Sequence, residues 1–120
     1  MRGRVRSVFV LDDDQEQAEL LASALRASTT IVVRTFTDPI RALAALNEEG
    51  TDLLVADIAM PWMDGVDVVS SARVKRPDLK VILVSGAEHG AEIARRNGLP
   101  FLAKPIDVDA LLAKVRDVLL

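Results

Sequence analysis

An α/β fold built around one parallel sheet is predicted by two features of the sequence. Short apolar runs such as 53–56 and 81–84 lack helical periodicity and suit strands buried on both faces. They alternate with segments whose apolar residues recur every three or four positions, as in amphipathic helices. Five strands alternating with five helices indicate right-handed crossovers within a single layered domain.

Five strands are predicted from their apolar and β-branched composition, at residues 5–11, 29–36, 53–57, 81–84 and 100–103. Five helices are predicted from their periodicity, at residues 16–27, from 39 to Gly50, 66–75, 91–97, and from 107 or 109 to the end. Asp38 followed by Pro39 is a typical helix start, while Pro77 stops the third helix and Gly98 suits a helix C-cap. Asp64 is a candidate cap for the helix that follows it.

The length and composition of the chain exclude several classes of function. At 120 residues and 50% apolar content, the chain predicts one compact domain, residues 1–120. The formal charge of −3 argues against direct nucleic-acid binding. The absence of cysteine excludes disulfides and thiol chemistry, and no apolar run approaches the ~20 residues that span a bilayer. With no signal peptide visible before the first strand, we expect a cytoplasmic protein without membrane contact.

Polar residues follow four of the predicted strands at their carboxyl ends. They are Asp12 and Asp13, Asp57, Ser85 and Lys104. Since the carboxyl ends of parallel strands lie along one edge, these side chains should converge there. Three neighbouring carboxylates repel one another unless a cation lies among them, and Mg²⁺ prefers such oxygen ligands.

The same residues suit phosphoryl transfer, which depends mainly on positioning and charge neutralisation. A carboxylate can itself act as the nucleophile and form an aspartyl phosphate. Asp57 is the best candidate, because it stands alone on a middle strand while Asp12 and Asp13 form a pair suited to metal binding. The positive charge of Lys104 would balance a carboxylate before phosphoryl transfer and a phosphoryl oxygen afterwards.

Four motifs in this order resemble the receiver domain of two-component response regulators, over essentially the whole chain. They are F-V-L-D-D-D at 9–14, D-I-A-M-P-W-M-D-G at 57–65, V-I-L-V-S-G at 81–86 and F-L-A-K-P at 101–105. The resemblance implies a flavodoxin-like, doubly wound sheet with strand order 2-1-3-4-5. It also implies a cis bond between Lys104 and Pro105.

The resemblance implies a role for each site residue. Asp57 would be the phosphoacceptor, and Lys104 would contact the phosphoryl oxygen. The Mg²⁺ ligands would be Asp12, Asp13, Asp57 and the carbonyl of Ala59. Ser85 and Phe101 would be the switch residues that respond to phosphorylation.

The implied function is signalling, not enzymatic turnover of a separate substrate. A sensor histidine kinase or phosphotransfer protein would donate the phosphoryl group, and the chain would catalyse only its own phosphorylation and dephosphorylation. The fourth helix, fifth strand and fifth helix would form the surface that partners read, or through which a homodimer forms. The interval from Ser85 to Lys104 is shorter than is usual in the family by about one helical turn of ~3.6 residues.

Other readings remain open from the sequence. Asp12 and Asp14 have the D-x-D spacing of haloacid-dehalogenase-like phosphatases, although Glu16 stands where that family has a hydroxyl or small residue. A receiver-like interaction module that needs no phosphate is a third possibility. Trp62 lies near enough to Asp57 to gate or report on the site, or is simply a partly exposed packing residue. The cognate kinase, the output and any longer parent protein are not specified.

Overall fold

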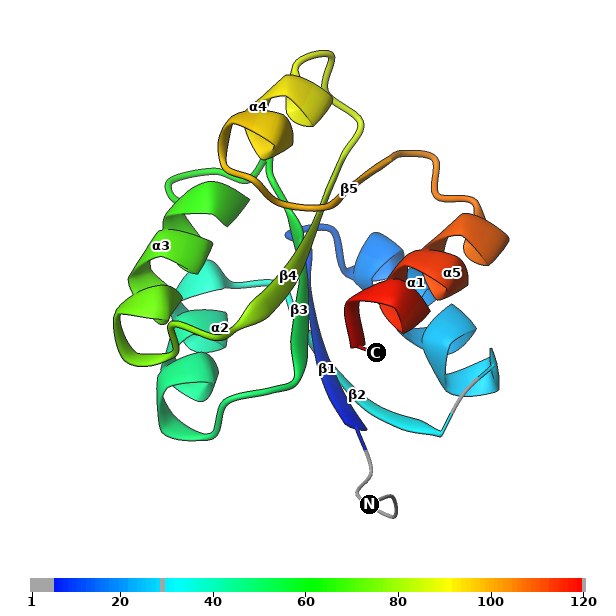
Figure 1. Ribbon diagram of the computed structural model, residues 1–120, viewed down its shortest axis with the longest axis horizontal. Coiled ribbons are helices and arrows are strands. Elements are labelled where there is room, and N and C mark those ends of the chain that lie inside the picture. The colour runs from blue at the N-terminus through cyan, green and yellow to red at the C-terminus, as the bar shows by residue number, and fades with distance from the viewer. Residues whose placement is uncertain (1–5, 29, 120) are drawn as a thin grey trace.

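The five strands form one parallel sheet, in the order β2-β1-β3-β4-β5. The computed structural model describes residues 6–28 and 30–119. The strands are β1 (Arg6–Leu11), β2 (Ile31–Phe36), β3 (Leu53–Asp57), β4 (Lys80–Ser85) and β5 (Phe101–Ala103). The helices are α1 (Gln15–Ser28), α2 (Pro39–Glu48), α3 (Gly65–Lys75), α4 (Gly90–Arg96) and α5 (Val108–Leu119). The predicted class and strand order are therefore confirmed (Figure 1).

Helices cover both faces of the sheet, and alternate strand residues face the two layers (Figure 1). On β3, Leu54 and Ala56 pack in the core beneath α2, α3 and α4. Leu53 and Val55 pack in the second core, beneath α1 and α5. Every residue of β3 is buried, and the four residues before Asp57 form the unbroken apolar run that such burial favours. Among the described residues, no helix has the length and apolarity needed to cross a bilayer.

The observed element boundaries differ from the predicted ones by one or two residues. β4 begins at Lys80, whose backbone pairs with Leu53. The sequence pattern missed this residue because its side chain is charged and the prediction followed apolar residues. Pro100 was predicted within the last strand; it precedes β5, yet its carbonyl accepts a hydrogen bond from Leu83 at 2.9 Å. Val5 and Thr29, the predicted first residues of two strands, lie outside the described residues.

The predicted helix caps are present. The side chain of Asp38 accepts a hydrogen bond from the Ile40 amide at 2.9 Å, with Pro39 beginning α2. Asp64 caps α3 in a reciprocal pair of hydrogen bonds with Asp67. Gly98 adopts a positive φ of 65° after α4, where the amide of Leu99 donates to the Ala94 carbonyl at 3.0 Å. These caps fix where α2 and α3 begin and where α4 ends.

The first residue of α3 lies directly against the end of β3. Gly65 donates its amide to the Ile58 carbonyl at 3.1 Å. A Cβ atom at this position would lie 2.5 Å from the backbone oxygen of Asp57. Only glycine therefore allows the helix to begin this close to the strand end.

Candidate functional site

The carboxyl edge of the sheet gathers the predicted site residues. β1 and β5 lead directly into Asp12 and Lys104, while Asp57 and Ser85 are the last residues of β3 and β4. Backbone pairing continues past the strand ends, since the Asp12 amide donates to the Phe36 carbonyl at 3.0 Å and the Lys104 amide to the Ser85 carbonyl at 2.9 Å. The bond between Lys104 and Pro105 is cis, as the sequence resemblance implies.

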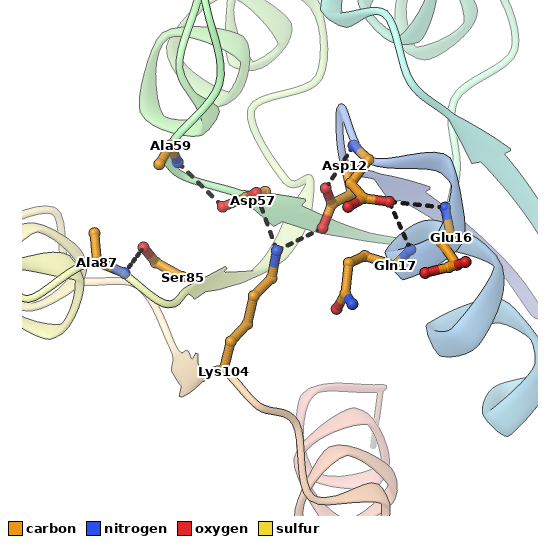
Figure 2. Close-up of polar contacts among 9 residues, drawn as sticks. Asp12, Glu16, Gln17, Asp57, Ala59, Ser85, Ala87 and Lys104 are labelled. Atoms are coloured by element: carbon orange, nitrogen blue, oxygen red, sulfur yellow. Dashed lines mark hydrogen bonds and ion pairs between the residues drawn. The ribbon is translucent and has the colours of Figure 1, made fainter.

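Lys104 bridges the two buried carboxylates of the site (Figure 2). Its Nζ atom lies 2.7 Å from Oδ2 of Asp12 and 3.1 Å from Oδ2 of Asp57. Asp12 is fully buried, and Asp57 is only 5% exposed. The second oxygens also have donors, the Asp14 amide to Asp12 Oδ1 at 2.9 Å and the Ala59 amide to Asp57 Oδ1 at 3.1 Å. Buried charges are tolerable here because each is hydrogen-bonded and paired.

Burial and pairing shift the pKa values of two groups in this bridge. Burial raises the pKa of Asp57 above its ordinary value, although the hydrogen bond and the charge of Lys104 act in the opposite direction. For Lys104, burial favours the neutral amine, but the carboxylates of Asp12 and Asp57 together raise its pKa. Lys104 is therefore firmly cationic at neutral pH, while ionised Asp57 is less favourable than a carboxylate in water.

Three carboxylates at this edge are close enough to share a cation. Asp12, Asp13 and Asp57 each offer an oxygen, and these oxygens lie within 4.8 Å of one another. Asp13 is exposed while the other two are buried, so the group faces solvent on one side. One lysine charge does not balance three carboxylates, and an all-oxygen donor set suits a hard divalent ion such as Mg²⁺. For Ala59, the structure gives a contact of the amide and not of the carbonyl that the resemblance implies as a ligand.

Asp14 has a different role from its two neighbours. Its Oδ1 accepts hydrogen bonds from the amides of Glu16, at 2.9 Å, and Gln17, at 3.3 Å. It thus caps the first turn of α1, as expected for an aspartate before a helix. The group of three carboxylates does not include it. This arrangement counts against the phosphatase reading, in which Asp12 and Asp14 act as a D-x-D pair.

The two predicted switch residues both lie next to Gly90, the first residue of α4. Ser85 is buried, and its hydroxyl oxygen accepts the Ala87 amide at 2.9 Å (Figure 2). Phe101 is partly buried and packs against the core. A Cβ on Gly90 would lie 2.8 Å from Ser85 Cβ and 3.1 Å from two ring carbons of Phe101. Sequence reasoning missed this contact of Gly90, for which the only signal was a glycine at the start of a helix.

Replacing Asp13 tests which aspartates hold the cation. We expect Asp13→Asn to weaken Mg²⁺ binding about tenfold, or about 1.4 kcal/mol, because one ligand charge is lost. The matched control is Asp14→Asn, which keeps a good helix cap and should leave the affinity unchanged. Isothermal titration with MgCl₂ measures both variants. Equal losses in the two would show that general acidity, and not the group of three carboxylates, attracts the ion.

The chain matches one family model and several curated regulators. The family described as the response regulator receiver domain matches residues 8–116. The C4-dicarboxylate transport transcriptional regulatory protein DctD of Rhizobium meliloti is 31% identical over 92% of this chain and 24% of its own length. The DNA-binding transcriptional regulator NtrC of Salmonella typhimurium is 32% identical over 90% of this chain and 24% of its own length. The chain thus spans about a quarter of the length of these relatives.

Solved structures agree with the fold. NtrX from Brucella abortus, in complex with ATP, has a TM-score of 0.87 and 28% identity, covering 97% of this chain and 27% of that protein. A CheY-like receiver domain protein from Methanospirillum hungatei has a TM-score of 0.86 and 24% identity, covering 97% of this chain and 94% of that one. The second likeness concerns the fold alone.

Proposed function

Because the chain belongs to the response regulator receiver domain family, we propose that Asp57 accepts a phosphoryl group from the phosphohistidine of a sensor histidine kinase or phosphotransfer protein. The position of Asp57 supports this role most directly. Its carboxylate ends the central strand, where Lys104 and the Ala59 amide hold its two oxygens. Asp12 and Asp13 flank it.

The proposed step is an in-line displacement at phosphorus. One carboxylate oxygen of Asp57 forms a bond to phosphorus while the bond from phosphorus to the donor's imidazole nitrogen breaks. The electron pair of that bond stays on the imidazole nitrogen. The ammonium group of Lys104, already within hydrogen-bonding distance of Asp57, can move to a phosphoryl oxygen without leaving the site. A buried carboxylate with a raised pKa needs this neighbouring positive charge to react as an anion.

Asp12, Asp13 and Asp57, with the Ala59 carbonyl as a further candidate, would hold Mg²⁺. When bound, the ion neutralises charge on the carboxylates and on the phosphoryl oxygens during transfer. The residues fit this role because they supply oxygen ligands only and leave one side open to solvent. Autodephosphorylation would use the same residues to position a water molecule.

Ser85 and Phe101 are the proposed switch. Phosphorylation adds about −1.5 to −2 charges and strong acceptor oxygens next to Ser85. The Ser85 hydroxyl would then donate to a phosphoryl oxygen, and the ring of Phe101 would move with it. Since Gly90 contacts both side chains, the start of α4 must respond as well. The signal would therefore reach the surface of α4, β5 and α5, where a partner or a second copy would bind, and the domain itself would not contact nucleic acid.

A mass measurement tests this function on the wild-type chain. Acetyl phosphate and MgCl₂ should produce a single phosphoryl adduct, and chelation of Mg²⁺ should prevent it. Borohydride trapping and peptide mapping should locate the adduct at Asp57. Sustained release of phosphate from an ester without such an adduct would favour a phosphatase. The absence of any adduct with a folded protein would favour an interaction module that needs no phosphate.

A further inference from the structure

Trp62 is held in an unusual backbone conformation in the loop that follows Asp57. It is the only tryptophan of the chain, and its side chain is fully exposed at 100%. Its φ of 67° is the one positive value among the described non-glycine residues. The Met63 amide donates to the Pro61 carbonyl at 2.8 Å, which closes a three-residue turn with Trp62 at its centre.

This conformation is maintained by the loop on either side of it. Such a φ is unfavourable for a bulky residue and persists only where the surroundings enforce it. Here, the Gly65 amide bonds to the Ile58 carbonyl, and Asp64 caps α3. The loop is therefore anchored at both ends. The indole of Trp62 nevertheless lies in solvent, so no burial of its apolar surface offsets the cost of the backbone conformation.

A shallow hollow next to Trp62 connects it to the proposed phosphoacceptor site. Its lining includes Asp13, Thr37, Pro39 and Met60 together with Trp62. Asp13 is also one of the three carboxylates that can share a cation. The hollow thus begins at the edge of the site and ends at the indole.

We propose that Trp62 and this hollow form a docking contact for the protein that carries the donating histidine. This inference rests on the proposed function. Asp57 is nearly buried, so a histidine on another protein can approach it only if that protein covers the edge of the sheet and the adjoining loop. An exposed tryptophan whose backbone is held by its loop presents the type of side chain that anchors protein interfaces. A small phosphodonor needs no such contact.

The charges around the hollow indicate which charges a partner surface should carry. Asp13 and Asp38 are exposed carboxylates on its rim, and Asp14 lies next to Asp13. Of these carboxylates, Asp38 has a basic neighbour in Arg41, whose Nε lies 3.9 Å from its Oδ2. A complementary surface would have an apolar pocket for the indole with Lys or Arg beside it.

The test compares a protein donor with a small one. The protein donor is an autophosphorylated histidine kinase, chosen from a purified set because it labels the wild-type chain fastest, and the small donor is acetyl phosphate. For each variant, the second-order rate constant with the kinase is divided by that with acetyl phosphate. We expect Trp62→Gly, which suits the positive φ, to lower this ratio about tenfold, or about 1.4 kcal/mol. Trp62→Phe should recover most of the loss, because an aromatic ring remains.

The matched control is Val74→Ala, on α3. Val74 is another exposed apolar residue, at 83%, but it lies nine positions and so about 14 Å along the helix from Gly65. This variant should keep the wild-type ratio. A ratio for Trp62→Gly within about twofold of wild type, or an equal loss in Val74→Ala, overturns the docking role. A wild-type chain that takes up no phosphoryl group from either donor overturns the proposed function itself, and this inference with it.

Discussion

Asp57→Asn is expected to gain no phosphoryl group from acetyl phosphate under conditions in which the wild-type chain gains one. A carboxamide has nearly the shape of a carboxylate, but it is neutral and is not a nucleophile toward phosphorus. Intact-mass spectrometry in the presence of Mg²⁺ measures the result directly. Asp14→Asn is the control, because it makes the same chemical change two residues beyond Asp12 and should still be labelled. A full adduct on Asp57→Asn would place the acceptor elsewhere.

The same variant should be more stable than wild type at neutral pH in metal-free buffer. Burial raises the folded-state pKa of Asp57 above 3.8, so the folded chain keeps a proton that the unfolded chain has already released. The contribution of Asp57 to stability therefore falls as pH rises from 3.8 through the raised pKa. Asparagine does not titrate and removes this loss.

Urea unfolding at several pH values measures this effect. The difference in unfolding free energy between Asp57→Asn and wild type should be largest at neutral pH and should shrink as pH falls toward 3.8. A variant less stable than wild type at neutral pH would mean that the ion pair of Asp57 with Lys104 outweighs the burial of the carboxylate.

Gly65→Ala should destabilise the fold by about 3 kcal/mol, near the upper end of the usual cost of overpacking. The added Cβ would lie 2.5 Å from the Asp57 carbonyl oxygen and 3.1 Å from its carbon. Neither the strand nor the helix can easily move to relieve this clash, because β3 is paired with a neighbour on each side and α3 is fixed by its cap. Urea unfolding measures the loss, and slower labelling of Asp57 should accompany it.

Gly98→Ala provides the matched control, since it adds the same methyl group at another glycine next to a helix end. Nothing lies within 4 Å of the Cβ position at Gly98, but its φ is +65°. The cost should therefore come from the backbone alone, about 1–2 kcal/mol. If both substitutions cost the same, the close approach of Gly65 to Asp57 does not limit the packing of α3.

Much of the edge of the sheet could be predicted, because each strand ends where an apolar run meets a polar residue. This signal correctly brought together Asp12, Asp13, Asp57 and Lys104. The sequence also predicts the helix caps of Asp38 and Asp64, since an aspartate before a helix satisfies free amides whatever the tertiary structure. Strand ends and helix caps could be predicted because each depends on residues that are adjacent in the sequence.

The remainder depends on packing between segments distant in the sequence. The bridging position of Lys104 and the contact of Gly90 with Ser85 and Phe101 are set by how closely a loop or helix approaches the sheet. Residue composition does not encode such distances. Trp62 was seen as a neighbour of Asp57, but its positive φ contradicts the preference of a bulky residue and follows only from the loop around it.

The place of β3 within the sheet has a mechanical consequence. This strand is fully buried and hydrogen-bonded to a neighbour on each side, whereas β5 has three residues and only one neighbour. Asp57, the proposed phosphoacceptor, thus ends a strand that is paired on both sides, whereas Phe101 lies on a short edge strand that is paired on one side only. A displacement that phosphorylation caused at Asp57 would meet the least resistance toward β5, and this would give the proposed signal a direction.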